Sequence, residues 1–336
     1  MRVRLFWLAL GMVMSSTFTA HGAPGNPSGW LLVANKGDHT LSVIDPVAGR
    51  QVRAIDVGGV SGHEVATSSD GRIAYVPIYG NSGVGRPGTD GSTLSVIDVR
   101  AGKIAGRVDF GHGVRPHCVE LGPKDGLLYV STELDQAITV IDPHGLKIVA
   151  KIPTGAAESH MFAISNDGRR AYTANVGPGS VSVLDLETRK LITTISVAPR
   201  IQRIAFSRDE RFIFTADQSK PQLAVIDTAA NTVTAWIPLP AIGYGGAATP
   251  DGRSLIVPLR SGNQVAVVAL DARKVTHVIE VPASPQEVLI SPAGDVAYVS
   301  CDTSQKVAVI RLSDWRVEKL IDAGPSADGL GWASAK

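Results

Sequence analysis

One phrase recurs along the 336-residue chain, and it constrains the fold more than any other feature. The phrase is an apolar strand that ends in Asp, as in residues 41–45, followed by a turn and a second alternating strand. The Asp is replaced only in the last two copies, and the aligned positions are Asp45, Asp98, Asp142, Asp185, Asp227, Ala269 and Arg311. Successive positions are 53, 44, 43, 42, 42 and 42 residues apart. A period of this length indicates one repeat architecture rather than two independent domains.

A second signature lies between these phrases and predicts a tight hairpin turn between alternating strands. It consists of the pairs Asp70-Gly71, Asp125-Gly126, Asp167-Gly168 and Asp251-Gly252. Each copy therefore comprises four short antiparallel strands, which is one propeller blade. The first copy begins at Trp30 without an innermost strand, whereas the segment from Gly324 to Ser334 aligns with innermost strands elsewhere. We predict an all-β, seven-bladed β-propeller formed by residues 24–336, in which the C-terminal strand completes blade 1 and closes the ring.

Four strands carry phrases that resemble a known repeat family. They are Tyr75-Val76, Tyr129-Val130-Ser131, Tyr172-Thr173-Ala174-Asn175 and Tyr298-Val299-Ser300. On these residues the chain resembles the YVTN family of exported bacterial propellers over essentially all of residues 24–336. The resemblance implies the fold, but relatives of that family include lactonase-like and heme-handling propellers, and a fold alone does not select a function.

The first 23 residues have the layout of a secretory signal peptide, with Arg2 and Arg4, a short apolar stretch and small residues up to Ala23. We therefore expect a periplasmic or secreted protein without a membrane span. Cys118 and Cys301 fall in different repeats, so we expect two free, buried thiols rather than a disulfide framework. The 32 basic and 31 acidic residues nearly cancel, and no basic run occurs, which excludes the footprint of a nucleic-acid binder. We expect a monomer whose partner is a small-molecule substrate or an envelope protein.

Residues at the start of the innermost strands converge at one mouth of a propeller, so the aligned column there is where a site is expected. The column, counted back from each inner-strand turn, is His63, His117, His160, Gln202, Tyr244, Gln286 and, from the closing strand, Asp328. Blades 2, 3 and 4 thus place histidine at one structural position. This pattern favours a shared site over three separate structural histidines.

Three converging imidazoles suit a divalent transition metal (Zn, Cu, Fe or Ni) with one coordination position left open. Without a metal, the same side chains would bind an anionic or polyol substrate, with one histidine as general base. Candidate catalytic residues near the same mouth are Glu64, Glu133, Tyr244 and Arg115. A carboxylate there would orient an imidazole by accepting its distal N–H, although polar residues at loop ends more often cap turns. Residues 79–92 form an insertion on this face, either a lid or an inert surface loop.

Three functions stay open on this reading. The first is a metal-dependent lyase or hydrolase, with His63, His117 and His160 as metal ligands. The second is a non-catalytic binding propeller of the cell envelope, since no complete catalytic motif is present. The third is a lactonase-like hydrolase without a tightly bound metal.

Overall fold

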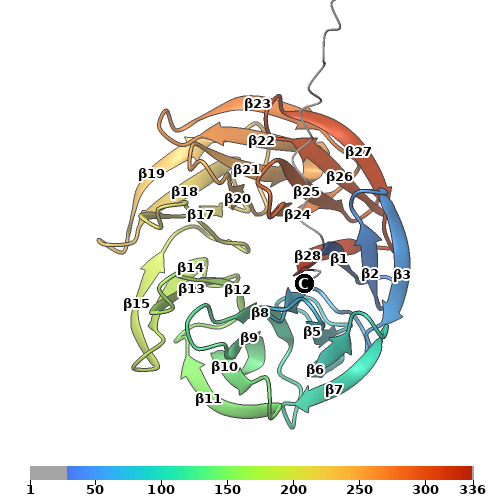
Figure 1. Ribbon diagram of the computed structural model, residues 1–336. Coiled ribbons are helices and arrows are strands. Elements are labelled where there is room, and N and C mark those ends of the chain that lie inside the picture. Colours follow the sequence, from blue (N-terminus) through green and yellow to red (C-terminus); the bar gives the residue numbers. More distant parts are fainter. Residues whose placement is uncertain (1–28, 335–336) are drawn as a thin grey trace, which may run out of the picture.

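Seven four-stranded antiparallel sheets form a closed ring in the computed structural model, which describes residues 29–334 (Figure 1). The predicted seven-bladed propeller is therefore confirmed. The predicted signal peptide at residues 1–23 lies outside the described residues. Each sheet radiates from the centre, so the first strand of every blade lies at the middle of the ring and the fourth at its rim (Figure 1).

Blades 1 to 3 have the following strands. Blade 1 consists of β28 (Ala327–Ser334), β1 (Gly29–Asn35), β2 (Thr40–Asp45) and β3 (Arg50–Asp56). Blade 2 consists of β4 (Ala66–Thr67), β5 (Ile73–Gly80), β6 (Asp90–Asp98) and β7 (Lys103–Asp109). Blade 3 consists of β8 (Pro116–Leu121), β9 (Leu128–Thr132), β10 (Ala137–Asp142) and β11 (Lys147–Pro153).

Blades 4 to 7 repeat the same order. Blade 4 has β12 (Ser159–Ile164), β13 (Arg170–Asn175), β14 (Ser180–Asp185) and β15 (Lys190–Ser196). Blade 5 has β16 (Ala205–Phe206), β17 (Phe212–Ala216), β18 (Gln222–Asp227) and β19 (Thr232–Pro238). Blade 6 has β20 (Ala247–Ala248), β21 (Ser254–Leu259), β22 (Gln264–Ala269) and β23 (Lys274–Glu280). Blade 7 has β24 (Pro285–Ile290), β25 (Val296–Cys301), β26 (Lys306–Arg311) and β27 (Arg316–Asp322).

The described residues contain two short 3-10 helices, η1 (Glu133–Asp135) and η2 (Arg260–Gly262). They follow β9 and β21 and end in Gln136 and Asn263, which both have left-handed backbone conformations. Within residues 29–334, no helix has the length and apolarity that crossing a membrane requires.

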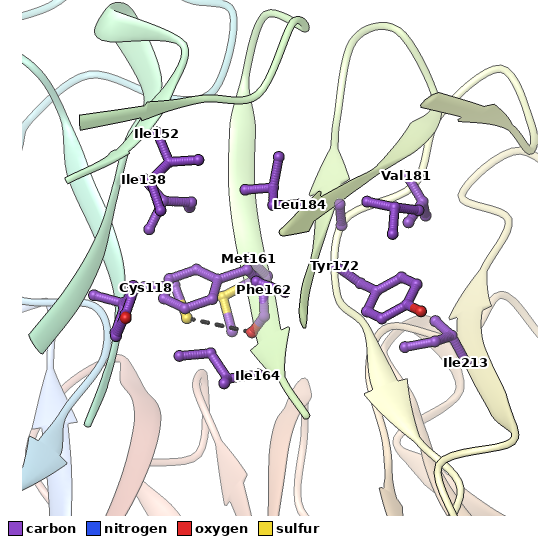
Figure 2. Packing of buried hydrophobic residues seen from close by; sticks show 14 of the residues in the cluster. Cys118, Ile138, Ile152, Met161, Phe162, Ile164, Tyr172, Val181, Leu184 and Ile213 are labelled. Atoms are coloured by element: carbon purple, nitrogen blue, oxygen red, sulfur yellow. Dashed lines mark hydrogen bonds between the residues drawn. The ribbon is translucent and has the colours of Figure 1, made fainter. Parts of the chain in front are cut away.

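The second and third strands of each blade are buried on both faces because the neighbouring blades cover them. Strand β2 shows this pattern, whereas every residue of β3 at the rim is exposed except the buried Ile55. Between blades 3, 4 and 5, apolar side chains from adjacent sheets interdigitate, among them Ile138, Phe162 and Ile213 (Figure 2). The Cys118 thiol donates to the Phe162 carbonyl at 3.7 Å in this layer. Both Cys118 and Cys301 are free and buried, as predicted.

The recurring Asp stabilises the turn between the third and fourth strands. Asp45 Oδ1 accepts the backbone N–H groups of Val47 and Ala48, each at 2.9 Å, and Asp227 makes the same pair of bonds in blade 5. An Asp side chain that accepts from the backbone two and three residues on is a common turn-forming device. The repeat is thus explained by turn chemistry rather than by a shared catalytic role.

The C-terminal strand closes the ring. Strand β28 pairs with β1 in antiparallel register, from Gly29 opposite Ser334 to Asn35 opposite Ala327. Blade 1 therefore combines one strand from the C-terminus with three from the N-terminal end of the described chain, as predicted. This closure joins two segments that are far apart in sequence in one hydrogen-bonded sheet.

Candidate functional site

Six of the seven aligned column residues line one cavity of about 390 Å³ at the centre of the ring. They are His63, His117, His160, Gln202, Tyr244 and Asp328. The predicted convergence of this column is confirmed. The seventh member, Gln286, donates from Nε2 to Asp302 at 3.1 Å, and its buried Oε1 has no partner among the described residues.

The three imidazoles are in direct contact with one another. His63 Nδ1 and His117 Nε2 lie 3.1 Å apart, and the rings of His117 and His160 are 3.5 Å apart between centroids. The buried Nδ1 of His117 has no hydrogen-bond partner within residues 29–334. Such an unsatisfied buried nitrogen is costly in a folded protein, so this cluster is a site whose polar groups are incompletely satisfied by the chain itself.

Glu133 holds His160 in one orientation and is itself held by Tyr79. Its Nδ1 contacts Glu133 Oε1, and the Tyr79 hydroxyl donates to the other Glu133 oxygen at 2.8 Å. In the tautomer whose Nδ1 donates to this carboxylate, Nε2 is the acceptor nitrogen, and the Gln202 amide nitrogen lies 3.3 Å from Nε2. A carboxylate behind an imidazole is the arrangement that fixes the tautomer of a metal-ligating histidine. Glu133 therefore has the orienting position expected for it from the sequence.

The environment keeps His63 and His117 neutral. Burial lowers the pKa of His63 to about 3, and the nearby cations Lys36 and Arg203 act in the same direction, whereas Asp328 opposes them. Burial, together with the neighbouring His160 and His63, holds the pKa of His117 well below its usual value. Neutral imidazoles at pH 7 are available as ligands or proton acceptors without first losing a proton.

The lining of the cavity is strongly cationic. Four basic side chains contribute to it: Lys36, Arg86, Arg200 and Arg260. The carboxylate among the lining residues is Asp328, which accepts from Lys36 at 3.0 Å. Burial alone would raise the pKa of Asp328, but Lys36 and Arg203 outweigh it and hold this pKa far below the usual range. The cavity is therefore suited to an anionic ligand.

A layer of buried charges lies directly beneath the histidines. Arg203 Nη2 donates to Glu64 at 2.7 Å and to Asp328 at 3.0 Å, and Arg203 Nη1 lies 3.8 Å from Glu287. Burial raises the pKa of Glu64 and of Glu287, while Arg203 opposes the shift in both. Their side chains face a second cavity of about 370 Å³, which also contains Cys118 and Glu120.

Two glycines make room for this charged layer. A Cβ atom on Gly245 would lie 2.8 Å from the Arg203 side chain, and one on Gly329 would lie 2.4 Å from the His63 carbonyl oxygen and 2.7 Å from Glu64 Oε2. Both positions follow a column residue by one, as do Glu64, Arg203 and Glu287. The position after the column is thus a second aligned layer, in which small and charged side chains fit together across the ring.

The predicted catalytic residues occupy different places. Tyr244 lines the histidine cavity, with the guanidinium groups of Arg203 and Arg260 each 5.3 Å from its ring centre. Glu64 lies in the deeper layer instead, because consecutive residues of a strand point in opposite directions. Arg115 is buried and binds Asp90 at 2.6 Å, and its guanidinium also donates to carbonyl oxygens in the insertion. It therefore fastens the insertion to blade 3, and residues 82–84 and 86 of the insertion form part of the cavity lining.

Sequence reasoning missed Lys36, Arg200 and Arg203. Lys36 follows β1 and reaches the cavity beside Asp328, which belongs to the opposite end of the chain. A usable signal existed for Arg203, because three charged residues recur at the position after the column. Lys36 and Arg200 carried no comparable signal in the repeat.

The metal predicted for the three histidines stays a prediction. Among the described residues, no group of three or more His, Cys, Asp and Glu side chains is placed so that it could hold a metal ion together. A site formed by all three imidazoles would require a side-chain rotation from the arrangement described above.

Comparisons with known proteins support a propeller of the same type. Three solved structures share the fold: hydrazine synthase of Kuenenia stuttgartiensis, the dihydro-heme d1 dehydrogenase NirN in complex with DHE, and a functionally unknown protein from Desulfotomaculum acetoxidans DSM 771. The first has a TM-score of 0.74 at 19% identity and covers 90% of this chain and 99% of its own. The second has a TM-score of 0.66 at 14% identity, with coverages of 92% and 76%. The third has a TM-score of 0.75 at 15% identity, with coverages of 92% and 100%.

At the level of sequence, the uncharacterized protein YwhL of Bacillus subtilis (strain 168) is 26% identical over 170 residues. The match covers 51% of this chain and 33% of YwhL, so the chain spans about a third of that protein's length. The model of the cytochrome D1 heme domain family matches residues 87–281, which is more than half of the chain and includes His117 and His160. The resemblance to YVTN repeats remains an interpretation of the strand phrases. On the extent of the family match, the chain belongs to the cytochrome D1 heme domain family.

Proposed function

We propose that the protein is an exported binding propeller that holds an anionic iron tetrapyrrole of the heme class in the histidine cavity, with His160 as the residue that would ligate the iron. The observation that carries the proposal is the imidazole of His160, whose Nδ1 is engaged by Glu133 and whose Nε2 lies at the cavity. Heme iron is commonly held by one histidine, and a hydrogen bond to its second ring nitrogen raises its basicity. Bound heme would supply a redox-active iron at this mouth.

The donor set of the cavity fits such a group. Tetrapyrroles carry carboxylate substituents, and guanidinium groups such as those of Arg200 and Arg260 pair well with carboxylates. The aromatic rings of Tyr79 and Tyr244 add apolar surface to the same lining. A volume of 390 Å³ is near the lower end of the usual range for small-molecule sites. The insertion that covers the cavity is therefore the segment that we expect to adjust to the size of the ligand.

Each residue around His160 has a separate task in this proposal. Glu133 and Tyr79 fix the orientation of the imidazole, and Gln202 donates to Nε2 when no ligand is bound. The basic side chains at the mouth neutralise the carboxylates of the ligand. If the predicted signal peptide directs export, the protein would bind its ligand in the periplasm or outside the cell.

Hemin is the probe that we choose for a test by absorbance titration. We expect the protein to form a saturable 1:1 complex with a red-shifted Soret band, and His160→Ala to weaken binding by more than about 100-fold. Glu133→Gln should weaken it less, by roughly 10–100-fold, because the ligand remains but loses its orienting charge. His277→Ala is the matched control, since His277 lies on rim strand β23 beside Trp315. Absence of saturable binding, or equal binding by folded His160→Ala, would contradict the proposal.

A bare divalent metal is a second candidate, and one observation favours it. His63 Nδ1 and His117 Nε2 are 3.1 Å apart. Two imidazole nitrogens bound to one tetrahedral Zn²⁺ at 2.0–2.1 Å lie roughly 3.3 Å apart, so this pair is close to the spacing that a metal requires. A third ligand would come, after a side-chain rotation, from His160 or from Asp328, whose Oδ2 lies 3.7 Å from His63 Nδ1. Metal-dependent lyase or hydrolase chemistry would rest on this site.

Elemental analysis of tag-free protein incubated with Zn²⁺ and then desalted separates the two candidates. If the metal candidate holds, wild-type protein retains about one equivalent, and His63→Ala and His117→Ala each retain almost none, because a pair of ligands is broken. His144→Ala, on the exposed turn after β10, should behave as wild type. Metal retention that is unchanged in both histidine variants would eliminate this candidate and leave the heme proposal unaffected.

A further inference from the structure

A third cavity lies in the groove between blades 5 and 6, and none of the three site histidines lines it. It has a volume of about 650 Å³, larger than the histidine cavity. Its floor is apolar and consists of Phe214, Val225 and Ile237, which are buried residues of blade 5. Its far wall comes from blade 6 and includes Gly252, Leu270 and Arg273.

The neighbouring groove, between blades 4 and 5, shows why this one is large. That groove is built from equivalent positions but has a volume of only about 310 Å³. Phe206 fills it by packing on Tyr172, at 5.4 Å between ring centroids. The residue 42 positions later, in blade 6, is Ala248. The aligned residues of blades 2, 3, 4 and 7 are also larger than alanine: Thr67, Leu121, Ile164 and Ile290.

Three further aligned positions also differ between the two grooves. At the same 42-residue spacing, Glu210 and Thr228 of the smaller groove correspond to Gly252 and Leu270, and Asn231, which does not line the smaller groove, corresponds to Arg273. These three changes remove a carboxylate, add an apolar side chain and add a guanidinium, while the replacement of Arg170 by Phe212 and of Ala229 by Asp271 leaves the overall charge balance of the lining unchanged. The groove of blades 5 and 6 is therefore wider and more apolar than its neighbour, and its guanidinium groups are Arg208, Arg211 and Arg273. An apolar floor with guanidinium groups at the rim is the combination that an amphipathic anion requires.

The guanidinium groups at the rim have free donors. Arg211 and Arg273 lie on the ring of Phe212, at 5.1 and 5.8 Å from its centre, and Arg208 also lines the groove. Within residues 29–334, none of the three forms an ion pair. The three carboxylates of the lining, Asp209, Asp251 and Asp271, accept hydrogen bonds from their own turns. A guanidinium stacked on an aromatic ring still offers its N–H edge to an anion.

We propose that this groove is a binding site for a small amphipathic anion, with an apolar body on Phe214, Val225 and Ile237 and a carboxylate or sulfonate at Arg211 and Arg273. The site is independent of the histidine cavity and of the function proposed for it. Its ligand class follows from the apolar floor, the unpaired guanidinium groups and the space that Ala248 leaves.

The fluorescent sulfonate 1-anilinonaphthalene-8-sulfonate tests the proposal, with neutral N-phenyl-1-naphthylamine as the matched uncharged probe. Wild-type protein should bind the sulfonate at one saturable site and more tightly than the neutral probe, and laurate should displace it. Ala248→Phe copies the side chain of the smaller groove, and we expect it to weaken sulfonate binding at least tenfold by filling the space. Arg273→Asn, which introduces the residue found 42 positions earlier at Asn231, should weaken binding of the sulfonate but leave binding of the neutral probe unchanged.

Two controls locate the probe. Phe206→Ala alters only the smaller groove and should leave the wild-type site intact, while His160→Ala leaves this groove untouched and should bind the sulfonate normally. Equal sulfonate binding by folded Ala248→Phe would overturn the proposal, and so would loss of sulfonate binding in folded His160→Ala. If Ala248→Phe fails to fold, the exposed-rim variant Arg273→Asn decides, because unchanged sulfonate affinity in that variant contradicts the proposed anion contact.

Discussion

Replacing Arg203 with Met should lower the free energy of unfolding by about 3–5 kcal/mol, because the change leaves buried carboxylates without their counter-charge. Arg203 is 5% exposed and contacts Glu64, Asp328 and Glu287, which come from three other blades. Methionine fills similar space, so the loss arises mainly from the charge rather than from a cavity. Urea unfolding of wild type and variant measures the difference.

A surface arginine provides the matched control for this prediction. Arg311 forms ion pairs with Asp314 at 3.0 Å and with Glu318 at 3.3 Å, but its side chain is 46% exposed. Exposed ion pairs contribute little, so Arg311→Met should change the free energy of unfolding by less than about 1 kcal/mol. Equal effects of the two substitutions would show that Arg203 acts as an ordinary solvated residue.

The pH dependence of the Arg203→Met deficit gives a second readout of the same charges. The folded-state pKa of Glu64 and of Glu287 is raised above the value near 4.5 of the unfolded chain. Between pH 4.5 and the raised pKa values, the folded state therefore binds more protons than the unfolded state. The free energy of unfolding falls as pH rises through this range. Without Arg203 these pKa values rise further, so the deficit of the variant should be large at pH 8 and smaller at pH 5. A deficit that grows toward pH 5 would contradict this assignment.

The framework of this protein follows from local patterns, which is why the sequence predicts it well. The recurring Asp reports a turn whose hydrogen bonds lie within three residues, as at Asp45. The 42-residue spacing then places His63, His117 and His160 at equivalent blade positions, and the ring brings them into contact. These inferences need only a period and the geometry of a propeller.

The repeat period alone does not predict the buried charged layer or the wide groove between blades 5 and 6. Glu64 and Arg203 are 139 residues apart and meet only across the centre of the ring, so neither position identifies its partner. Arg115 was expected near the catalytic centre, yet its side chain holds the insertion through Asp90 and two carbonyl oxygens. A polar residue beside a site can support a loop or contact a ligand, and the direction of its side chain decides which. In the sequence, the groove between blades 5 and 6 is indicated only by the small residue Ala248 in place of a larger one. The significance of this alanine becomes clear only by comparison with Phe206 in the adjacent blade.

Removal of the closing strand should abolish cooperative folding. A chain that ends at Asp322 lacks β28, so the ladder from Gly29 opposite Ser334 to Asn35 opposite Ala327 is lost and β1 becomes an open edge. The deletion also removes the buried Leu330, the stacking of Trp332 on Tyr298 and the Asp328 partner of Arg203. Burial of one leucine alone contributes about 1.5–3 kcal/mol, and a whole domain is stable by only about 5–15 kcal/mol. We expect no cooperative urea transition and binding of hydrophobic dyes.

A circular permutant distinguishes loss of the strand from loss of chain length. Because Ser334 lies opposite Gly29 in antiparallel register, residues 324–334 can precede Gly29 through a short Asn-Gly turn in a chain that again ends at Asp322. This permutant has the same C-terminus as the truncated chain but retains β28, and we expect a cooperative transition close to that of wild type. If the truncated chain unfolded as cooperatively as the permutant, ring closure by β28 would contribute little to stability. The truncated chain and the permutant share one C-terminus, so the predicted difference in their unfolding cooperativity tests ring closure by β28. A blade that lacks its innermost strand leaves the faces of both neighbouring blades uncovered.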